Sequence, residues 1–184
     1  MEFAEAKQLM EEHISEDNLR KHCLASAAVM RGLARRLGED EQTWAVTGML
    51  HDLDFETTKD QPHRHGLLAV ELLAGKGLPE ECLTAIKAHN AEALGLSRDS
   101  RLDIALTAGE TITGLVVATA LVYPDKKLAS VKPKSVAKRM KEKAFAAAVN
   151  RDHIRLCEEL GIPLAEFAAL AVASMAEISD ELGL

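Results

Sequence analysis

The sequence predicts an all-α fold, a single-domain helical bundle of about eight to ten helices. Apolar residues recur at spacings of three and four along most of the 184-residue chain, which is the period of one helix face. No segment alternates for long between apolar and polar residues, as half-buried strands do. Aromatic residues make up only 3% of the chain, which favours helices packed through small residues over a β-sandwich.

Capping residues and glycines set the expected helix boundaries in the first half of the chain. Ser15 to Asp17 offer capping groups for a helix that Gly38 ends, and Asp40 caps the helix that follows. Gly48 lies inside that next helix, where glycine costs about 1 kcal/mol relative to alanine, so we expect a neighbouring helix to approach it closely. Pro79 suits the first turn of a later helix. The helices expected here span residues 2–14, 18–37, 41–53, 67–73 and 79–89, with a polar loop over 54–64.

The second half of the chain begins with the longest apolar helix, which Pro124 should end. A basic segment from Lys126 to Lys143 follows, with eight lysines or arginines against one acid. A Gly-Ile-Pro break at residues 161–163 then separates two further helices. The helices expected in this half span residues 102–123, 154–160 and 164–182.

Composition and charge limit the functions and the cellular compartments that we expect for the chain. With 47% apolar and 28% charged residues, the chain has the composition of an ordinary folded protein. The net charge of −7 gives no general attraction to nucleic acid or to an anionic membrane. Three widely separated cysteines and an acidic N-terminus indicate a cytoplasmic protein with reduced thiols and no signal peptide. We find no apolar run of the length that spans a bilayer, so no membrane partner is expected.

The dipeptide His51-Asp52 directly follows an apolar run and is the centre of the functional prediction. Neighbouring residues on a helix point about 100° apart, so the two side chains can reach one metal ion from adjacent directions. Buried ionisable groups are costly unless they are paired or coordinated. The pair therefore indicates a metal site at the end of a buried helix.

Other polar residues on or at the ends of apolar helices extend this site. Four imidazoles and two carboxylates suit one or two divalent transition-metal ions, either Fe, Mn, Ni, Co or Zn. A carboxylate beside a histidine can also bridge two ions, which would then activate a water for attack on a phosphoester. The predicted metal ligands are His22, His51, Asp52, His65, His89 and Glu110.

The order of His22, then His51-Asp52, then a carboxylate at Glu110 resembles the HD-domain superfamily of metal-dependent phosphohydrolases, with its motif H…HD…D. The resemblance covers roughly residues 18–123, and it implies a helical metal-site core over that range with a C-terminal helical extension over residues 124–184. His65 and His89 resemble the two additional histidines of subgroups that bind a second metal ion.

One ligand departs from the family pattern, because Glu110 stands where the family normally has aspartate. Glutamate binds the same metals but reaches one methylene further. Asp103, one heptad earlier on the same helix, is the alternative carboxylate. His63 is likewise an alternative to His65, although the position of His65 beside Gly66 at a helix start favours it.

Further candidates concern catalysis and substrate binding. Asp52 and Glu56 are the candidate catalytic residues, with Glu56 as a general acid or base, as a partner of a ligand histidine, or as a plain surface residue. Thr111 and Thr113 are expected to serve helix packing. Basic residues after residue 123 either attract a substrate phosphate at the mouth of the site or form a solvated helix face. These residues are Lys126, Lys127, Lys132 and Arg151.

The predicted function is that of a metal-dependent phosphohydrolase that uses metal-activated water on a nucleotide or another small phosphoester. A non-catalytic ligand-binding or sensor module is the first alternative, because of the glutamate at position 110. A di-iron oxygenase on the same scaffold is the second. The expected partner is a small phosphorylated substrate, and the chain is expected to be a monomer or homodimer. Nucleic acid is not expected, because the basic segment has too few aromatic residues to stack bases.

Overall fold

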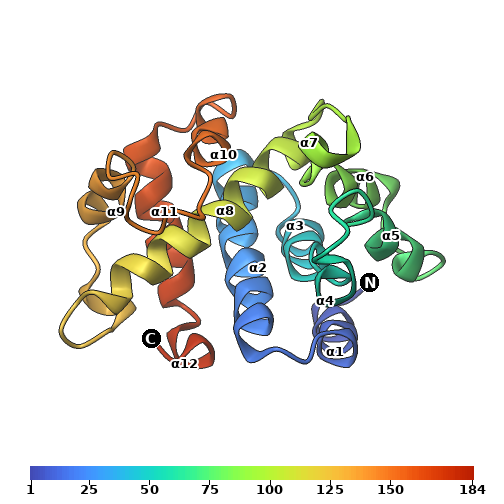
Figure 1. The fold of residues 1–184 in the computed structure, drawn as a ribbon, viewed down its shortest axis with the longest axis horizontal. Helices are drawn as coiled ribbons and strands as arrows, with labels where there is room; N and C mark the ends of the chain where they lie inside the picture. The colour runs from blue at the N-terminus through green and yellow to red at the C-terminus, as the bar shows by residue number, and fades with distance from the viewer.

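Helices make up all the regular structure of the computed structural model, which describes residues 1–184 (Figure 1). Eight of its twelve α-helices have seven or more residues, and the other four are short pieces of four or five. The all-α prediction is confirmed. The first seven helices are α1 (Phe3–His13), α2 (Asp17–Leu37), α3 (Glu41–Leu50), α4 (Phe55–Thr58), α5 (Leu67–Leu73), α6 (Glu80–Ala88) and α7 (Ala91–Leu94). The rest are α8 (Arg101–Leu121), η1 (Leu128–Ser130), α9 (Pro133–Arg139), α10 (Arg151–Arg155), η2 (Leu156–Glu158), α11 (Leu164–Ala176) and α12 (Ser179–Leu182), where η marks a 3-10 helix.

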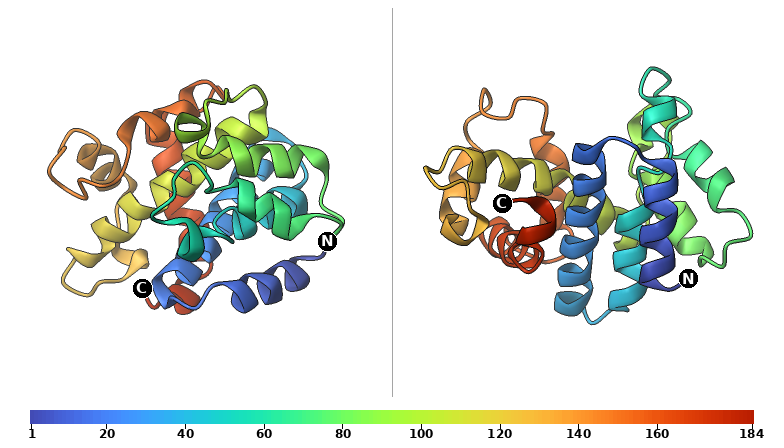
Figure 2. Two further views of the ribbon diagram at one scale, coloured as in Figure 1. Left: turned by 45° about the vertical axis from the view of Figure 1, so that its right-hand side comes forward. Right: turned by 90° about the horizontal axis from the view of Figure 1, so that it is seen from below.

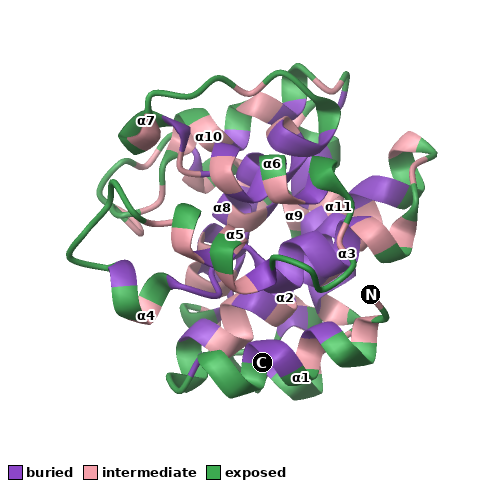
Figure 3. Ribbon diagram, turned by 90° about the vertical axis from the view of Figure 1, so that its right-hand side faces the viewer, coloured by how far each residue is buried: buried purple, intermediate pink, exposed green.

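The two longest helices, α2 and α8, cross in the middle of the molecule. Figure 1 shows α1 and α3 to α7 on one side of this crossing and α9, α11 and α12 on the other. The surfaces of α3 and α8 are largely buried, whereas the short helices α4 and α7 carry exposed residues (Figure 3). The crossing helices therefore form the centre around which the remaining elements are packed.

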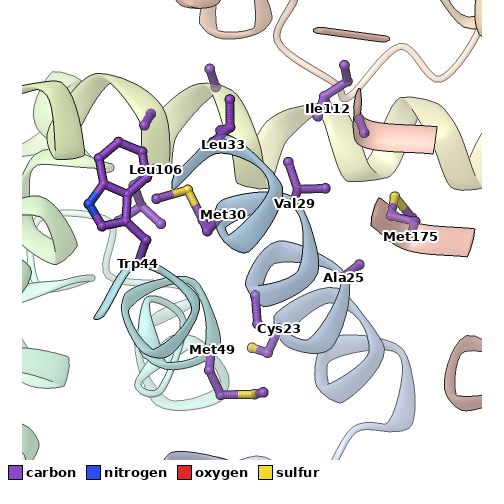
Figure 4. Close-up of a cluster of buried hydrophobic side chains, with 14 of the residues drawn as sticks. Cys23, Ala25, Val29, Met30, Leu33, Trp44, Met49, Leu106, Ile112 and Met175 are labelled. Atoms are coloured by element: carbon purple, nitrogen blue, oxygen red, sulfur yellow. The ribbon is translucent and has the colours of Figure 1, made fainter. Parts of the chain in front are cut away.

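Glycines let the central helices approach one another. A Cβ atom at Gly48 of α3 would lie 2.8 Å from the backbone oxygen of Ser26 and 2.9 Å from Cγ of Met30, both on α2. A Cβ atom at Gly109 of α8 would lie 3.0 Å from Sδ of Met30. The close approach expected at Gly48 is therefore present. Figure 4 shows Met30 among the buried side chains between these helices, close to Trp44.

Three of the expected helices differ clearly from the structure, and the polar loop expected over 54–64 contains the short helix α4. The helix expected to reach residue 53 ends at Leu50, and residues 51–54 form turns. The helix expected over 154–160 is a short α10 followed by the 3-10 helix η2. The last expected helix is interrupted after Ala176, which leaves α12 as a separate turn. Sequence periodicity does not detect such breaks, because the apolar spacing continues through them.

The helix α8 corrects the expectation about apolar length. It has 21 residues and a mean hydropathy of 1.6 in its most apolar window, which is long and apolar enough to cross a bilayer. However, 61% of that window is buried by the other helices, as in the core helix of a soluble protein. The apolar character of α8 is thus explained by its central position.

One hydrophobic cluster runs through both halves of the chain. It includes Met30 and Leu106 of the central helices together with Ile154, Phe167 and Met175 from the C-terminal part. The assignment to a single domain stays a prediction, and the shared core favours it. The division into a metal-site core and a C-terminal extension also stays a prediction.

We expect Gly48→Ala to lower the free energy of unfolding by about 1–3 kcal/mol, because the new methyl group would meet a backbone oxygen that cannot move aside easily. Urea denaturation measures this change. Gly114→Ala on α8 is the control, since its Cβ would meet only a side-chain methyl of Val149 at 3.1 Å. Equal stability of the two variants would contradict the close approach at Gly48.

Candidate metal centre

The six predicted ligands converge on one buried place although they come from distant parts of the chain. Nε2 of His22 on α2 lies 3.2 Å from Nε2 of His51, which follows α3. Nε2 of His65 lies 2.8 Å from Nε2 of His89, which follows α6. The carboxylate of Asp52 lies between these two histidine pairs.

Asp52 presents one carboxylate oxygen to each pair. Its Oδ2 lies 3.6 Å from Nε2 of His22 and 3.5 Å from Nε2 of His51. Its Oδ1 lies 3.2 Å from Nε2 of His65 and 3.5 Å from Nε2 of His89. Two groups of three donors therefore share this carboxylate, and within each group the donor atoms lie within 4.8 Å of one another.

Two of the imidazoles are oriented by the ends of the helices that carry them. His51 and His89 are the C-cap residues of α3 and α6, and each Nδ1 donates to the carbonyl oxygen three residues earlier. The acceptors are Gly48, at 2.9 Å, and Ile86. A carbonyl only accepts, so Nδ1 carries the proton and Nε2 is left as the free nitrogen. Both Nε2 atoms face Asp52.

Asp54 orients His65 and was not identified from the sequence. Its Oδ1 accepts from Nδ1 of His65 at 2.9 Å, and its Oδ2 accepts from the backbone N–H groups of Gly66 and Ala69. Gly66 has a φ of +85°, and a Cβ there would lie 2.9 Å from the carbonyl oxygen of Ile86. A buried acid two residues after Asp52, just before a polar loop, was the available signal for Asp54.

Thr113 orients His22 and corrects the expectation that it serves helix packing alone. Its hydroxyl donates to the carbonyl oxygen of Glu110 at 2.6 Å, which uses its one proton. It therefore accepts from Nδ1 of His22, at 3.0 Å. Nε2 of His22 is again the free nitrogen, so all four imidazoles offer the same atom to the centre.

The donor set fits divalent transition metals. Zn–N bonds of about 2.0–2.1 Å place neighbouring ligand atoms roughly 2.8–3.4 Å apart in octahedral or tetrahedral geometry. The separations of 3.2–3.6 Å around Asp52 are close to this range. Imidazole nitrogen and carboxylate oxygen suit the predicted metals Fe, Mn, Ni, Co and Zn. Each histidine also has the Nδ1 hydrogen bond that metal-binding imidazoles normally make.

Burial and hydrogen bonds set the ionisation of the site. Burial lowers the pKa of His51 to about 3, so this imidazole is neutral at pH 7. Burial works against protonation of His65, but hydrogen bonds to Asp52 and Asp54 outweigh it and raise the pKa to about 9. Burial raises the pKa of Glu110 to about 8, helped by the charge of Asp52. Without metal, protons therefore reside on His65 and Glu110.

Glu110 is the carboxylate that α8 brings to the site. Its Oε2 lies 3.7 Å from Nε2 of His22, and its Oε1 accepts from the hydroxyl of Thr111. The alternative Asp103 instead caps the start of α8, where its Oδ2 accepts from the backbone N–H groups of residues 99 and 100. His63, the alternative to His65, is exposed on the loop. The geometry thus favours Glu110 and His65.

The structure gives Glu56 a place different from the expected one. Its carboxylate accepts hydrogen bonds from the backbone N–H groups of Ser15 and Glu16 and from the Ser15 hydroxyl, at 2.6–2.8 Å. These bonds lower the pKa of Glu56 and fix the turn before α2. We therefore do not retain Glu56 as a general acid or base.

The predicted phosphate-binding residues also lie elsewhere. The guanidinium of Arg151 donates to backbone carbonyl oxygens of residues 142, 145, 146 and 149, so it holds that turn together. The exposed Lys126, Lys127 and Lys132 follow the far end of α8, which lies about 16 Å along the helix from Glu110 (Figure 1). The structure therefore does not bring these four residues to the site.

A hydrogen-bonded network that was not identified from the sequence connects the site to the C-terminal part of the chain. Arg98 donates to the carbonyl oxygen of His89 at 3.1 Å and to the hydroxyl of Thr107 at 2.8 Å. Its guanidinium also binds the carboxylate of Glu92 through two bonds of 2.7 and 2.8 Å. Glu92 accepts from Nε2 of His153 on α10 at 3.0 Å as well. The backbone of His89, a predicted ligand, is thus held by Arg98, which Glu92 of α7 and Thr107 of α8 hold in turn.

A comparison with protein families agrees with this geometry. The family model described as HD domain matches residues 19–120, which include all six predicted ligands. No curated protein and no solved structure matches the chain.

Because both groups share Asp52, we expect Asp52→Ala to remove metal from both, whereas His89→Ala should remove it from one only. Each variant is loaded with metal, and elemental analysis then measures the metal content per chain. His63→Ala is the control, since that exposed residue is outside the site. Identical metal losses in the Asp52 and His89 variants would contradict the shared carboxylate.

We expect Thr113→Val to weaken metal binding by about 10–100-fold, because His22 loses the acceptor that fixes its orientation. Thr113→Ser should restore the affinity. Thr119→Val is the matched control on the same helix, since its hydroxyl bonds only to the carbonyl oxygen of Leu115. Calorimetric titration with Zn or Mn measures all three, and an unchanged affinity in Thr113→Val would contradict the role of Thr113.

Metal binding should also release protons at pH 7, by about two per chain, because His65 and Glu110 must each lose one before they can act as ligands. The release should fall as the pH rises through 8 and 9, where Glu110 and His65 lose their protons even without metal. Calorimetry in buffers of different ionisation enthalpy measures it. Glu110→Gln should release about one proton fewer, and a release independent of pH would contradict the expectation.

Proposed function

The chain belongs to the HD-domain superfamily of metal-dependent phosphohydrolases, and from this premise we propose that it hydrolyses small phosphoesters at the two donor groups that share Asp52. The observation that supports the proposal most is the carboxylate of Asp52, with one oxygen toward each histidine pair. Four further contacts, from Gly48, Ile86, Asp54 and Thr113, fix the imidazoles in the orientation that such a site needs.

Divalent ions bound at such a site lower the pKa of a water molecule and neutralise charge on phosphoryl oxygens. The residues of the chain supply the geometry for this chemistry. His51 and Asp52 are almost fully buried, so the inner side of the site excludes bulk water. Glu110 and His22 lie at its more accessible side, where a substrate phosphate can approach.

A non-catalytic ligand-binding or sensor module is the second candidate, because of the glutamate at position 110. The position of its carboxylate, 3.7 Å from Nε2 of His22, favours the enzyme, since the longer side chain still reaches the site. The third candidate, a di-iron oxygenase, shares the four histidines and the bridging carboxylate.

We further propose that the protein acts in the cytoplasm, as a monomer or homodimer, on a small phosphorylated substrate rather than on nucleic acid. Its three cysteines are free and buried, as in proteins of reducing compartments. Its net charge of −7 disfavours a polyanionic partner.

Protein loaded in turn with Mn, Co, Ni, Zn or Fe should hydrolyse at least one member of a panel of phosphomonoesters, dinucleoside polyphosphates and cyclic nucleotides. Phosphate release measures the activity, and His51→Ala should lose most of it together with bound metal. Glu56→Gln is the control outside the site and should retain activity. Tight ligand binding without product would favour the sensor, and oxygen consumption with two irons per chain would favour the oxygenase.

A further inference from the structure

A cavity of about 540 Å³ adjoins the metal centre on the side of His22. His22 and Thr113 form part of its wall, so a molecule in the cavity would touch the imidazole that faces Asp52. The volume is within the range of about 300–1,000 Å³ typical of small-molecule sites. The cavity is therefore large enough for part of a substrate.

The accessible side of the metal centre is the side of this cavity. The side chain of His22 is 26% exposed and that of Glu110 is 18% exposed, whereas that of His51 is 1% exposed. His22, the most accessible of these three side chains, is thus the one that borders the cavity.

The wall of the cavity is mainly apolar. Ala25 of α2 and Val117, Ala118 and Leu121 of α8 line it. Leu182 and the neighbouring C-terminal residues close another part, since α12 lies against the first turns of α2 (Figure 2). Such a wall favours an aliphatic group, because burial of apolar surface is the main gain available there.

The polar residues of the wall do not fit a nucleotide. Lys21 is the one cation among the lining residues, and Asp17 already pairs with it at 2.8 Å. No aromatic side chain lines the cavity to stack a base. A polyphosphate would therefore lack free cations, and a nucleobase would lack a stacking surface.

Resting on the function proposed above, we propose that this cavity holds the aliphatic part of the substrate, so that the protein acts on phosphate monoesters of aliphatic alcohols. The phosphate lies at the metal centre, and the chain extends past His22 between α2, α8 and α12. Water adds to phosphorus, the bond from phosphorus to the alcohol oxygen breaks, and the products are inorganic phosphate and the alcohol.

A series of n-alkyl phosphates with two to eight carbons tests the proposal in the metal-loaded protein. We expect kcat/KM to rise by about two- to fourfold for each methylene until the cavity is filled. Adenosine monophosphate, the nucleotide comparison, should be a poorer substrate than octyl phosphate. A kcat/KM that does not depend on chain length would overturn the proposal.

Three variants test whether the dependence on chain length arises in this cavity. Leu121→Ser should weaken the dependence on chain length, whereas Val122→Ser should not, because the equally accessible Val122 does not line the cavity. Ala118→Trp should fill the cavity and abolish the dependence while bound metal stays the same. An unchanged dependence in Leu121→Ser and Ala118→Trp would contradict the assignment.

Calorimetric titration with n-alkyl phosphonates, which are not hydrolysed, separates the two proposals. Affinity that rises with chain length, without turnover of any phosphate, would support the cavity assignment and contradict the phosphohydrolase. Turnover without any effect of chain length on binding or rate would support the phosphohydrolase and overturn the cavity assignment. An experiment in which the protein shows no binding and no turnover would contradict both proposals.

Discussion

The structure depends on the burial of one carboxylate, Asp52, among four imidazoles. An ionised carboxylate in an apolar interior is unfavourable unless positive charge or hydrogen bonds compensate it. In this protein, helices from separate parts of the chain end or cross where their imidazoles can face the two oxygens of Asp52. The close packing at Gly48 and Gly109 serves the same arrangement, because it brings α2, α3 and α8 together beside the site.

Backbone carbonyl groups orient two of the four imidazoles, and side chains orient the other two. His51 and His89 use carbonyl groups that a helix end leaves without partners, so the fold itself supplies their acceptors. His22 and His65 depend instead on the side chains of Thr113 and Asp54. In each histidine pair, a backbone carbonyl therefore orients one imidazole and a particular side chain orients the other.

The sequence was sufficient for the helical class, because apolar periodicity is a local feature. The six residues predicted as metal ligands lie close together in the structure, and their role stays a prediction. The sequence was not sufficient for Thr113, whose partner His22 is 91 positions away. It also misled for Glu56 and Arg151, since residue type does not reveal that nearby backbone groups already occupy a charge. Tertiary contacts decide which charged groups remain free for chemistry.

The network from His89 through Arg98 and Glu92 to His153 has a consequence for the architecture. Glu92 has two cationic or polar partners, one from the segment before α8 and one from α10. An exchange of residues 124–184 for another helical segment would remove His153 and leave Arg98 as the remaining side-chain partner of Glu92. The backbone of one predicted metal ligand is thus connected to the C-terminal helices through two side chains, Arg98 and Glu92.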